Sequence, residues 1–166
     1  TREATVAAVD KSSGKTIWKT GRPSEAYAEN EHSYASPVLY RDKERAYLLS
    51  HGADYIVAHD LDDGSELWRC GGLHPPTYDP TLRFVASPLA IPGLIIVPSA
   101  KRGVTLALRP DGSGDITANE KFVNWSFEIT PDVPSPLVLD DIVYLNRQNG
   151  KDLLNILELT TSKPFG

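Results

Sequence analysis

The sequence predicts an all-β protein, a partial β-propeller of four-stranded antiparallel blades with about three blades present. Two short motifs recur in the same order about fifty residues apart. The segments between them are short and rich in apolar, β-branched and aromatic residues, as strands are. No window of about ten residues or more shows a helical period. We therefore expect a single propeller segment over 1–166.

The first motif is Ala-x-Asp-x-x-x-Gly-x-x-x-Trp, which is complete at 8–18 and again at 58–68. A third copy closes at Trp125 after an insertion. A fainter fourth copy has Glu158 at the Asp position and Phe165 near the Trp position. The copies divide the chain into repeat units at approximately 1–20, 33–70, 84–127 and 132–166.

Each position of this motif has a structural use in a propeller blade. The Asp ends a strand and can accept hydrogen bonds from the backbone amides of the turn that follows. The Gly supplies a positive φ in that turn at little steric cost. The Trp can lie across the next blade and offer its indole N–H to that blade's backbone. The residues that we assign to this motif are Asp10, Gly14, Trp18, Asp60, Gly64, Trp68 and Trp125.

The second motif is a Ser-Pro pair that leads the first strand of a unit, where the missing N–H of Pro breaks no ladder bond. It contains Ser36, Ser87 and Ser135. Because these serines recur once per unit, we expect them to be structural and not nucleophilic. Further strands are expected at 45–50, 54–60, 94–99, 103–108 and 141–146.

Composition excludes several classes of protein. The net charge of -5 argues against nonspecific binding to nucleic acid or to an anionic membrane, which needs clustered Lys and Arg. No apolar run is long enough to span a bilayer, and the segment contains no signal peptide. The single cysteine, Cys70, cannot form an internal disulfide, and we expect it to be an inert small hydrophobe.

Two groups of polar residues resemble metal sites, but each also has a structural explanation. The four histidines, considered together with Asp54 and Asp60, match no zinc spacing, so we expect loop and edge histidines that hydrogen-bond locally. Loop 110–120 has Asp111, Ser113 and Asp115 at alternate positions, but it lacks the Gly and Glu of a calcium loop. We expect a polar loop between strands there, and we predict no catalytic, cofactor-binding or metal-binding residue.

The first motif at this period resembles the repeat of quinoprotein-type propellers, the pyrroloquinoline-quinone (PQQ) repeat-like domains. That family includes quinoprotein alcohol dehydrogenases and, without cofactor, the lipoprotein propeller of the bacterial outer-membrane protein assembly machinery. The pattern over 35–72 also resembles bacterial PQQ-like repeat proteins. The resemblance implies an exported bacterial protein, located in the periplasm or outside the cell.

The same resemblance implies a test for the cofactor. In the dehydrogenases PQQ is held by calcium with Glu, Asn and Asp ligands, beside a catalytic Asp, a stacking Trp and often a vicinal cysteine pair. This chain has one cysteine, and its three tryptophans all occupy the blade-closing position. We therefore predict the scaffold without PQQ or calcium, and we expect no enzyme activity from these residues.

The remaining candidates for function are two equivalent loops, 21–34 and 72–84, which gather at one end of a propeller. We predict a non-catalytic binding or protein-interaction scaffold whose partner is a protein or a polymer. The alternative is a piece of a PQQ-dependent quinoprotein dehydrogenase whose PQQ and calcium ligands lie outside this segment, and a third possibility is a glycan-binding propeller. The loops themselves can also simply cover blade edges. The candidate binding surface is Tyr27, His32, Tyr34, His74, Tyr78 and Arg83.

Counting blades adds one more expectation. At about fifty residues per blade the chain supplies roughly three, whereas closed propellers have about four to eight. Three blades alone would leave long unpaired strand edges. We therefore expect either further blades in a larger propeller or a ring that another chain completes.

Overall fold

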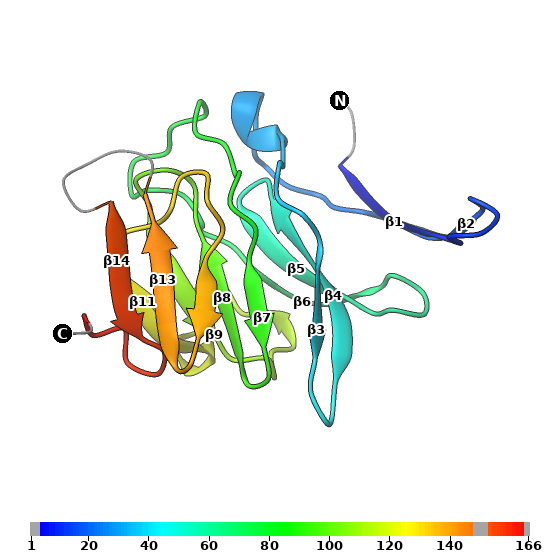
Figure 1. Ribbon diagram of the computed structural model, residues 1–166. Helices are drawn as coiled ribbons and strands as arrows, with labels where there is room; N and C mark the ends of the chain where they lie inside the picture. Colours follow the sequence, from blue (N-terminus) through cyan, green and yellow to red (C-terminus); the bar gives the residue numbers. More distant parts are fainter. Residues whose placement is uncertain (1–3, 148–152, 165–166) are drawn as a thin grey trace.

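The computed structural model describes residues 4–147 and 153–164 and shows an all-β protein (Figure 1). Four sheets stand side by side in chain order, as the blades of a propeller do. Helix in the described residues is confined to two short 3-10 turns, and none is long or apolar enough to cross a membrane. The 3-10 turns are η1 (Ala28–Glu31) and η2 (Glu120–Phe122).

The second and third sheets each contain the predicted antiparallel order of four strands. The first sheet is the hairpin β1 (Thr5–Val9) and β2 (Thr16–Gly21). The second contains β3 (Val38–Arg41), β4 (Ala46–Gly52), β5 (Tyr55–His59) and β6 (Glu66–Cys70). The third contains β7 (Leu89–Ile91), β8 (Leu94–Pro98), β9 (Thr105–Leu108) and β11 (Val123–Phe127). The fourth contains β12 (Leu137–Leu139), β13 (Ile142–Asn146) and β14 (Leu154–Glu158).

The third sheet lies between two hydrophobic cores and contributes side chains to both. Successive side chains of a strand point to opposite faces, so β8 contributes to both. Ile95 and Val97 pack with residues of the second sheet in one cluster. Leu94 and Ile96 pack with residues of the fourth sheet in the other. All five residues of β8 are buried, which explains its continuous apolar sequence.

The turns of the first motif have the predicted geometry. Asp10 Oδ1 accepts hydrogen bonds from the backbone amides of Ser12 and Ser13 at 3.2 and 2.7 Å. Asp60 Oδ1 accepts one from the amide of Asp62 at 2.7 Å. The glycines of these two turns, at positions 14 and 64, have φ of +70° and +75°. The carboxylate and the glycine together close the turn that leads to the Trp strand.

Two of the three motif tryptophans fasten one blade to the next. The indole N–H of Trp18 donates to the carbonyl of Leu61 at 2.9 Å, and that of Trp125 donates to the carbonyl of Leu159 at 2.7 Å. Both carbonyls directly follow the motif Asp position of the next sheet. Phe165, expected near the Trp position of the fourth copy, lies outside the described residues.

Trp68 departs from this pattern. The carbonyl at the equivalent position in the third sheet is that of Pro110, which accepts a hydrogen bond from the Tyr47 hydroxyl at 2.9 Å. The Tyr47 and Trp68 rings meet edge to face, with centroids 5.9 Å apart. The indole N–H of Trp68 is buried and has no partner among the residues that the structure describes. The interrupted third copy therefore loses the hydrogen bond while keeping the ring packing.

The Ser-Pro motif forms a second link between blades. The backbone N–H of Ser36 donates to Ser87 Oγ at 2.8 Å, and the N–H of Ser87 donates to Ser135 Oγ at 3.0 Å. Each motif serine thus binds its counterpart one repeat away. The hydroxyls of Ser87 and Ser135 thus serve as acceptors between neighbouring blades.

The insertion in the third repeat adds a strand to the preceding blade, which the sequence did not predict. β10 (Gly114–Asp115) runs parallel to β6, with Gly114 opposite Trp68 and Asp115 opposite Arg69. Next to it Ile116 is buried in the core between the second and third sheets. The strand covers the outer edge of β6, so the insertion is more than the polar loop that we expected.

Candidate functional site

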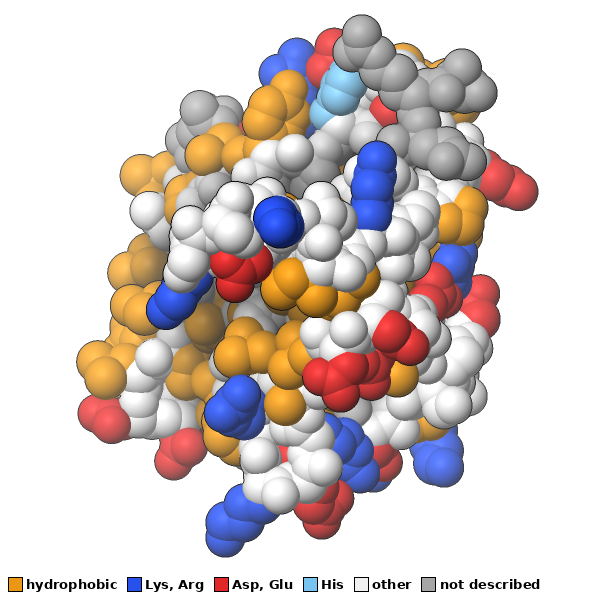
Figure 2. All heavy atoms as spheres, turned by 90° about the vertical axis from the view of Figure 1, so that its right-hand side faces the viewer, with side chains coloured by type: hydrophobic (Ala, Val, Ile, Leu, Met, Phe, Trp, Pro, Cys, Tyr) orange, Lys and Arg blue, Asp and Glu red, His pale blue; other side chains and the backbone are white. Residues whose placement is uncertain are grey.

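Loops 21–34 and 72–84 lie together at the end of the molecule that carries η1 (Figure 1). The Glu29 amide donates to the Pro80 carbonyl at 3.0 Å, and the Tyr34 amide donates to the Phe84 carbonyl at 2.9 Å. The buried Asn30 adds a side-chain bond to the Asp79 carbonyl at 3.3 Å. Figure 2 shows histidine, basic, acidic and hydrophobic side chains side by side at the upper end of the molecule. The two loops therefore form one fixed surface.

Three of the predicted surface residues form one aromatic group. The Tyr27 and Tyr78 ring centroids are 5.4 Å apart, and the His74 ring meets Tyr78 edge to face at 5.2 Å. The three side chains line a pocket of about 270 Å³, which we call the Asp54 pocket. Its lining is Glu25, Tyr27, Asp54, Tyr55, Gly72, His74 and Tyr78.

Tyr34 and Arg83 form a second group a short distance along the same loops. The Arg83 guanidinium lies 5.7 Å from the centroid of the Tyr34 ring, and its Nε is 2.5 Å from a Glu29 carboxylate oxygen. His32 is exposed, and among the described residues no side-chain hydrogen bond, ion pair or ring contact joins it to the other five candidates. The predicted surface is thus two clusters and one separate residue.

Asp54 belongs to this site, although the sequence pointed to it only as a weak metal candidate. It lies in the two-residue turn between β4 and β5, and both turn residues, Ala53 and Asp54, have positive φ, 52° and 67°. Asp54 Oδ1 is buried without a hydrogen-bond partner among the described residues. Burial raises the pKa of the Asp54 carboxyl above its ordinary value of 3.8, and the nearby His74 lowers it by a smaller amount.

Two of the other histidines are buried in strands, and one of them is not where the sequence placed it. His51 was expected in a loop, but it belongs to β4 and pairs with Ile56 of β5. His59 is also buried, with Nε2 2.8 Å from Ser50 Oγ and Nδ1 3.2 Å from the Gly64 carbonyl. Burial lowers the pKa of His51 to about 3 and lowers that of His59, so both rings are neutral near pH 7. Within the described residues no group of three His, Cys, Asp or Glu is placed to hold a metal ion.

Cys70 is buried at the end of β6, and this burial raises the pKa of its thiol to about 11. Because the thiolate is the reactive form, we expect iodoacetamide at pH 8 to alkylate the native protein at least about 100-fold more slowly than the urea-unfolded chain. Mass spectrometry of the time course measures both rates. Equal rates would show that Cys70 is accessible and ionised in the native state.

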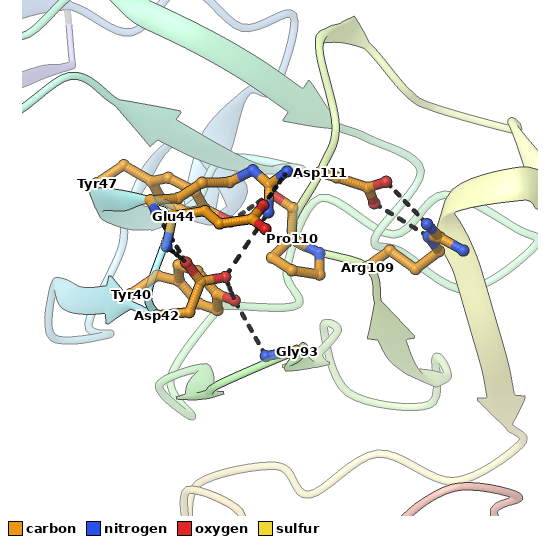
Figure 3. Close-up of polar contacts among 9 residues, drawn as sticks. Tyr40, Asp42, Glu44, Tyr47, Gly93, Arg109, Pro110 and Asp111 are labelled. Atoms are coloured by element: carbon orange, nitrogen blue, oxygen red, sulfur yellow. Dashed lines mark hydrogen bonds and ion pairs between the residues drawn. The ribbon is translucent and has the colours of Figure 1, made fainter.

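A second pocket, of about 720 Å³, lies between the second and third sheets and was not predicted from the sequence (Figure 3). The Tyr40 hydroxyl donates to Asp42 at 2.6 Å and accepts from the Gly93 amide at 3.0 Å. Arg109 binds Asp111 through two hydrogen bonds of 3.0 and 2.8 Å. The charged side chains drawn in Figure 3 largely pair with one another, and Arg41 and Lys43 add two further positive charges to the lining.

The residues described do not fit a PQQ site of the kind that the resemblance implies. Trp18, Trp68 and Trp125 are only 8%, 1% and 6% exposed, because each ring is packed between sheets. None of the three indoles presents a face on which a cofactor can stack. Cys70 is the chain's one cysteine, so it has no neighbour with which to form a vicinal disulfide.

Strand order, the blade-to-blade contacts of the two motifs and the adjacent sheets define the fold class: the chain folds as a segment of a β-propeller with four-stranded antiparallel blades. Among solved structures it is similar to BamB from Moraxella catarrhalis, with a TM-score of 0.70 and 17% identity. The match covers 99% of this chain and 46% of that one. No protein-family model and no curated protein matches the sequence.

Two enzymes share the fold more loosely. A europium-containing methanol dehydrogenase has a TM-score of 0.51 and 16% identity, over 71% of this chain and 22% of that one. Quinohemoprotein alcohol dehydrogenase from Pseudomonas putida HK5 has a TM-score of 0.53 and 15% identity, over 89% of this chain and 21% of that one. The chain spans less than half the length of each of these proteins. At such identities the likeness establishes the fold alone.

Proposed function

We propose that this propeller segment is a non-catalytic binding scaffold of an exported bacterial protein, and that its partner docks on loops 21–34 and 72–84. The observation that carries the proposal is the exposure of Tyr27 and Tyr34, each 55%, on loops that main-chain hydrogen bonds hold in place. Exposed aromatic side chains on a rigid support are typical anchors of protein interfaces. The motif Asp residues, by contrast, are occupied in local turns, and Trp18 and Trp125 are occupied in blade-to-blade contacts.

The partner that we propose is a protein, met in the periplasm or outside the cell. The location follows from the resemblance to exported PQQ-like repeat proteins, and the protein partner follows from the mixed aromatic and charged character of the two clusters. The quinoprotein dehydrogenase remains the second candidate, because two dehydrogenases share the fold. Dye reduction by the full-length protein after addition of PQQ and calcium would favour that candidate.

The test of the scaffold is the double variant Tyr78→Ala/Arg83→Ala, which removes one side chain from each cluster. We expect capture of the partner from a periplasmic extract to fall at least about tenfold, as for the loss of interface anchors. Quantitative mass spectrometry of the captured proteins measures the change. Arg109→Ala, which alters the pocket between the second and third sheets instead, is the control. Equal capture by all three proteins would contradict the proposed surface.

A further inference from the structure

We propose that the Asp54 pocket binds an organic cation on a flexible stem, the ammonium group of a lysine side chain on the partner protein. This inference rests on the proposed function, because it specifies what the loop surface recognises. The pocket of about 270 Å³ lies just below the range of drug-sized ligand sites and suits one inserted side chain. It collects aromatic rings from three segments around one carboxylate.

The carboxylate supplies the first argument. Asp54 Oδ1 is shielded from solvent and has no hydrogen-bond donor among the described residues. A carboxylate with one oxygen out of water and without a donor costs free energy. Asp54 as a whole is only partly buried and lines the pocket, and its Oδ2 is not shielded in the same way. A cation that binds at Oδ2 therefore offsets the cost of burying this charge. The second acid of the pocket, Glu25, is exposed at the rim. No basic side chain of the described residues forms an ion pair with either acid, so both negative charges are available to a ligand.

The rings supply the second argument. Ring faces attract cations, and the chain already uses Tyr55 in this way, with the Arg69 guanidinium 5.2 Å from its centroid. Gly71 allows Tyr55 to lie there, since a side-chain carbon at that position would approach the ring to 2.6 Å. Tyr27 and Tyr78 contribute two further rings to the lining. Because the Tyr55 ring is already occupied by Arg69, the rings open to a cation in the pocket are those of Tyr27 and Tyr78.

The backbone supplies the third argument. Positive φ at two successive non-glycine residues costs conformational energy, and such conformations concentrate at functional sites. Here other groups hold the turn: Ser24 Oγ donates to the Ala53 carbonyl at 2.7 Å, and Arg22 donates to the Gly52 carbonyl at 3.0 Å. Asp54 is thus fixed before any ligand arrives, as a preorganised site requires.

The same features argue against other ligands. An anion would meet two carboxylates. Calcium and magnesium need about six oxygen ligands, and the two carboxylates of this lining fall well short of that number. For any metal, no group of three His, Cys, Asp or Glu among the described residues is placed to hold the ion. A neutral apolar side chain would leave the cost of burying the Asp54 charge in place. An ammonium group provides the donors and the charge, and its alkyl stem can lie against the tyrosine rings.

The test is a titration of the ¹⁵N-labelled chain with Nα-acetyl-lysine methylamide, followed by NMR. The neutral control ligand is Nα-acetyl-norleucine methylamide, which has a similar stem and no charge. We expect the amide signals of Asp54, Tyr55 and His74 to shift with the lysine compound and not with the norleucine compound. Equal shifts with the neutral compound, or the same shifts with calcium chloride alone, would overturn the proposal.

Substitutions distinguish the contribution of the Asp54 carboxylate to binding from that of surface charge in general. Asp54→Asn should weaken lysine-amide binding at least tenfold. Glu25→Gln makes the same change of charge at the exposed rim of the same pocket and should weaken binding about twofold, because solvent screens that charge. Asp62→Asn, at the opposite end of β5, should have no effect. Undiminished binding by Asp54→Asn would overturn the proposal.

Folding does not confound this comparison. Asn tolerates positive φ at least as well as Asp, and the amide places no charge in the buried position. We therefore expect Asp54→Asn to unfold at a urea concentration no lower than the native protein. The proposed function has a separate outcome: if Tyr78→Ala/Arg83→Ala abolishes partner capture while Asp54→Asn and added lysine amide do not, the scaffold stands and the cation site falls. If lysine amide binds but no variant affects capture, the pocket accepts an ammonium group but the partner does not dock there, and both the docking surface and the partner lysine are rejected.

Discussion

Gly64→Ala is expected to lower the free energy of unfolding by about 3–4 kcal/mol, whereas Gly14→Ala should lower it by about 1–2 kcal/mol. Both glycines occupy the same motif position with nearly the same φ, +70° and +75°. They differ in their surroundings: a side-chain carbon at position 14 meets nothing within 4 Å, but one at position 64 lies 2.4 Å from Cε3 of Trp18. Urea unfolding of the two variants measures the difference.

The excess cost of Gly64→Ala is attributable to the contact between blades. The ring of Trp18 rests on the turn that contains Gly64, and its indole N–H reaches the Leu61 carbonyl of the same turn. In a Trp18→Leu background the added methyl group has more room, so Gly64→Ala should there cost less than in the native background. Its cost should still exceed that of Gly14→Ala, because the added carbon also approaches Thr20 Oγ1 to 2.8 Å. Equal losses for the two glycine variants in the native background would contradict this account.

The repeat made much of the architecture predictable. A motif that recurs at a fixed period reports a structural unit and a neighbour of the same kind, so the roles of Asp10, Gly14 and Trp18 could be stated from chemistry alone. The strands also followed from their apolar runs and their turn residues. The repeat indicated that neighbouring units contact each other, but it did not show which atoms meet, such as the Ser36 N–H and Ser87 Oγ.

The features that the sequence did not predict depend on contacts that occur only once in the chain. β10 is only two residues long, too short for any alternation to reveal it. Asp54 became part of the site because an Ala-Asp pair forms a turn for which Gly or Asn is usual, so the turn residues gave no signal. Tyr47 sits among ordinary strand residues, and only the fold shows that its hydroxyl occupies the carbonyl that Trp68 would otherwise bind.

The three motif tryptophans are expected to differ sharply when each is replaced by Phe. Trp125→Phe should lower the free energy of unfolding by about 2–4 kcal/mol, since it leaves a cavity and deprives the Leu159 carbonyl of its donor at 2.7 Å. Trp18→Phe should behave similarly because of its bond to the Leu61 carbonyl. Trp68→Phe also leaves a cavity, but it removes a buried donor that has no partner among the described residues.

Trp68→Phe should therefore cost about 1–3 kcal/mol less than Trp125→Phe, although Trp68 is the most buried of the three rings. Packing alone predicts the opposite order, because the ring with the least exposure would leave the least relaxed cavity. The order of the three variants in urea unfolding therefore decides between the two effects. If Trp68→Phe proves the most damaging, ring packing and not the indole N–H is what joins the blades of this propeller.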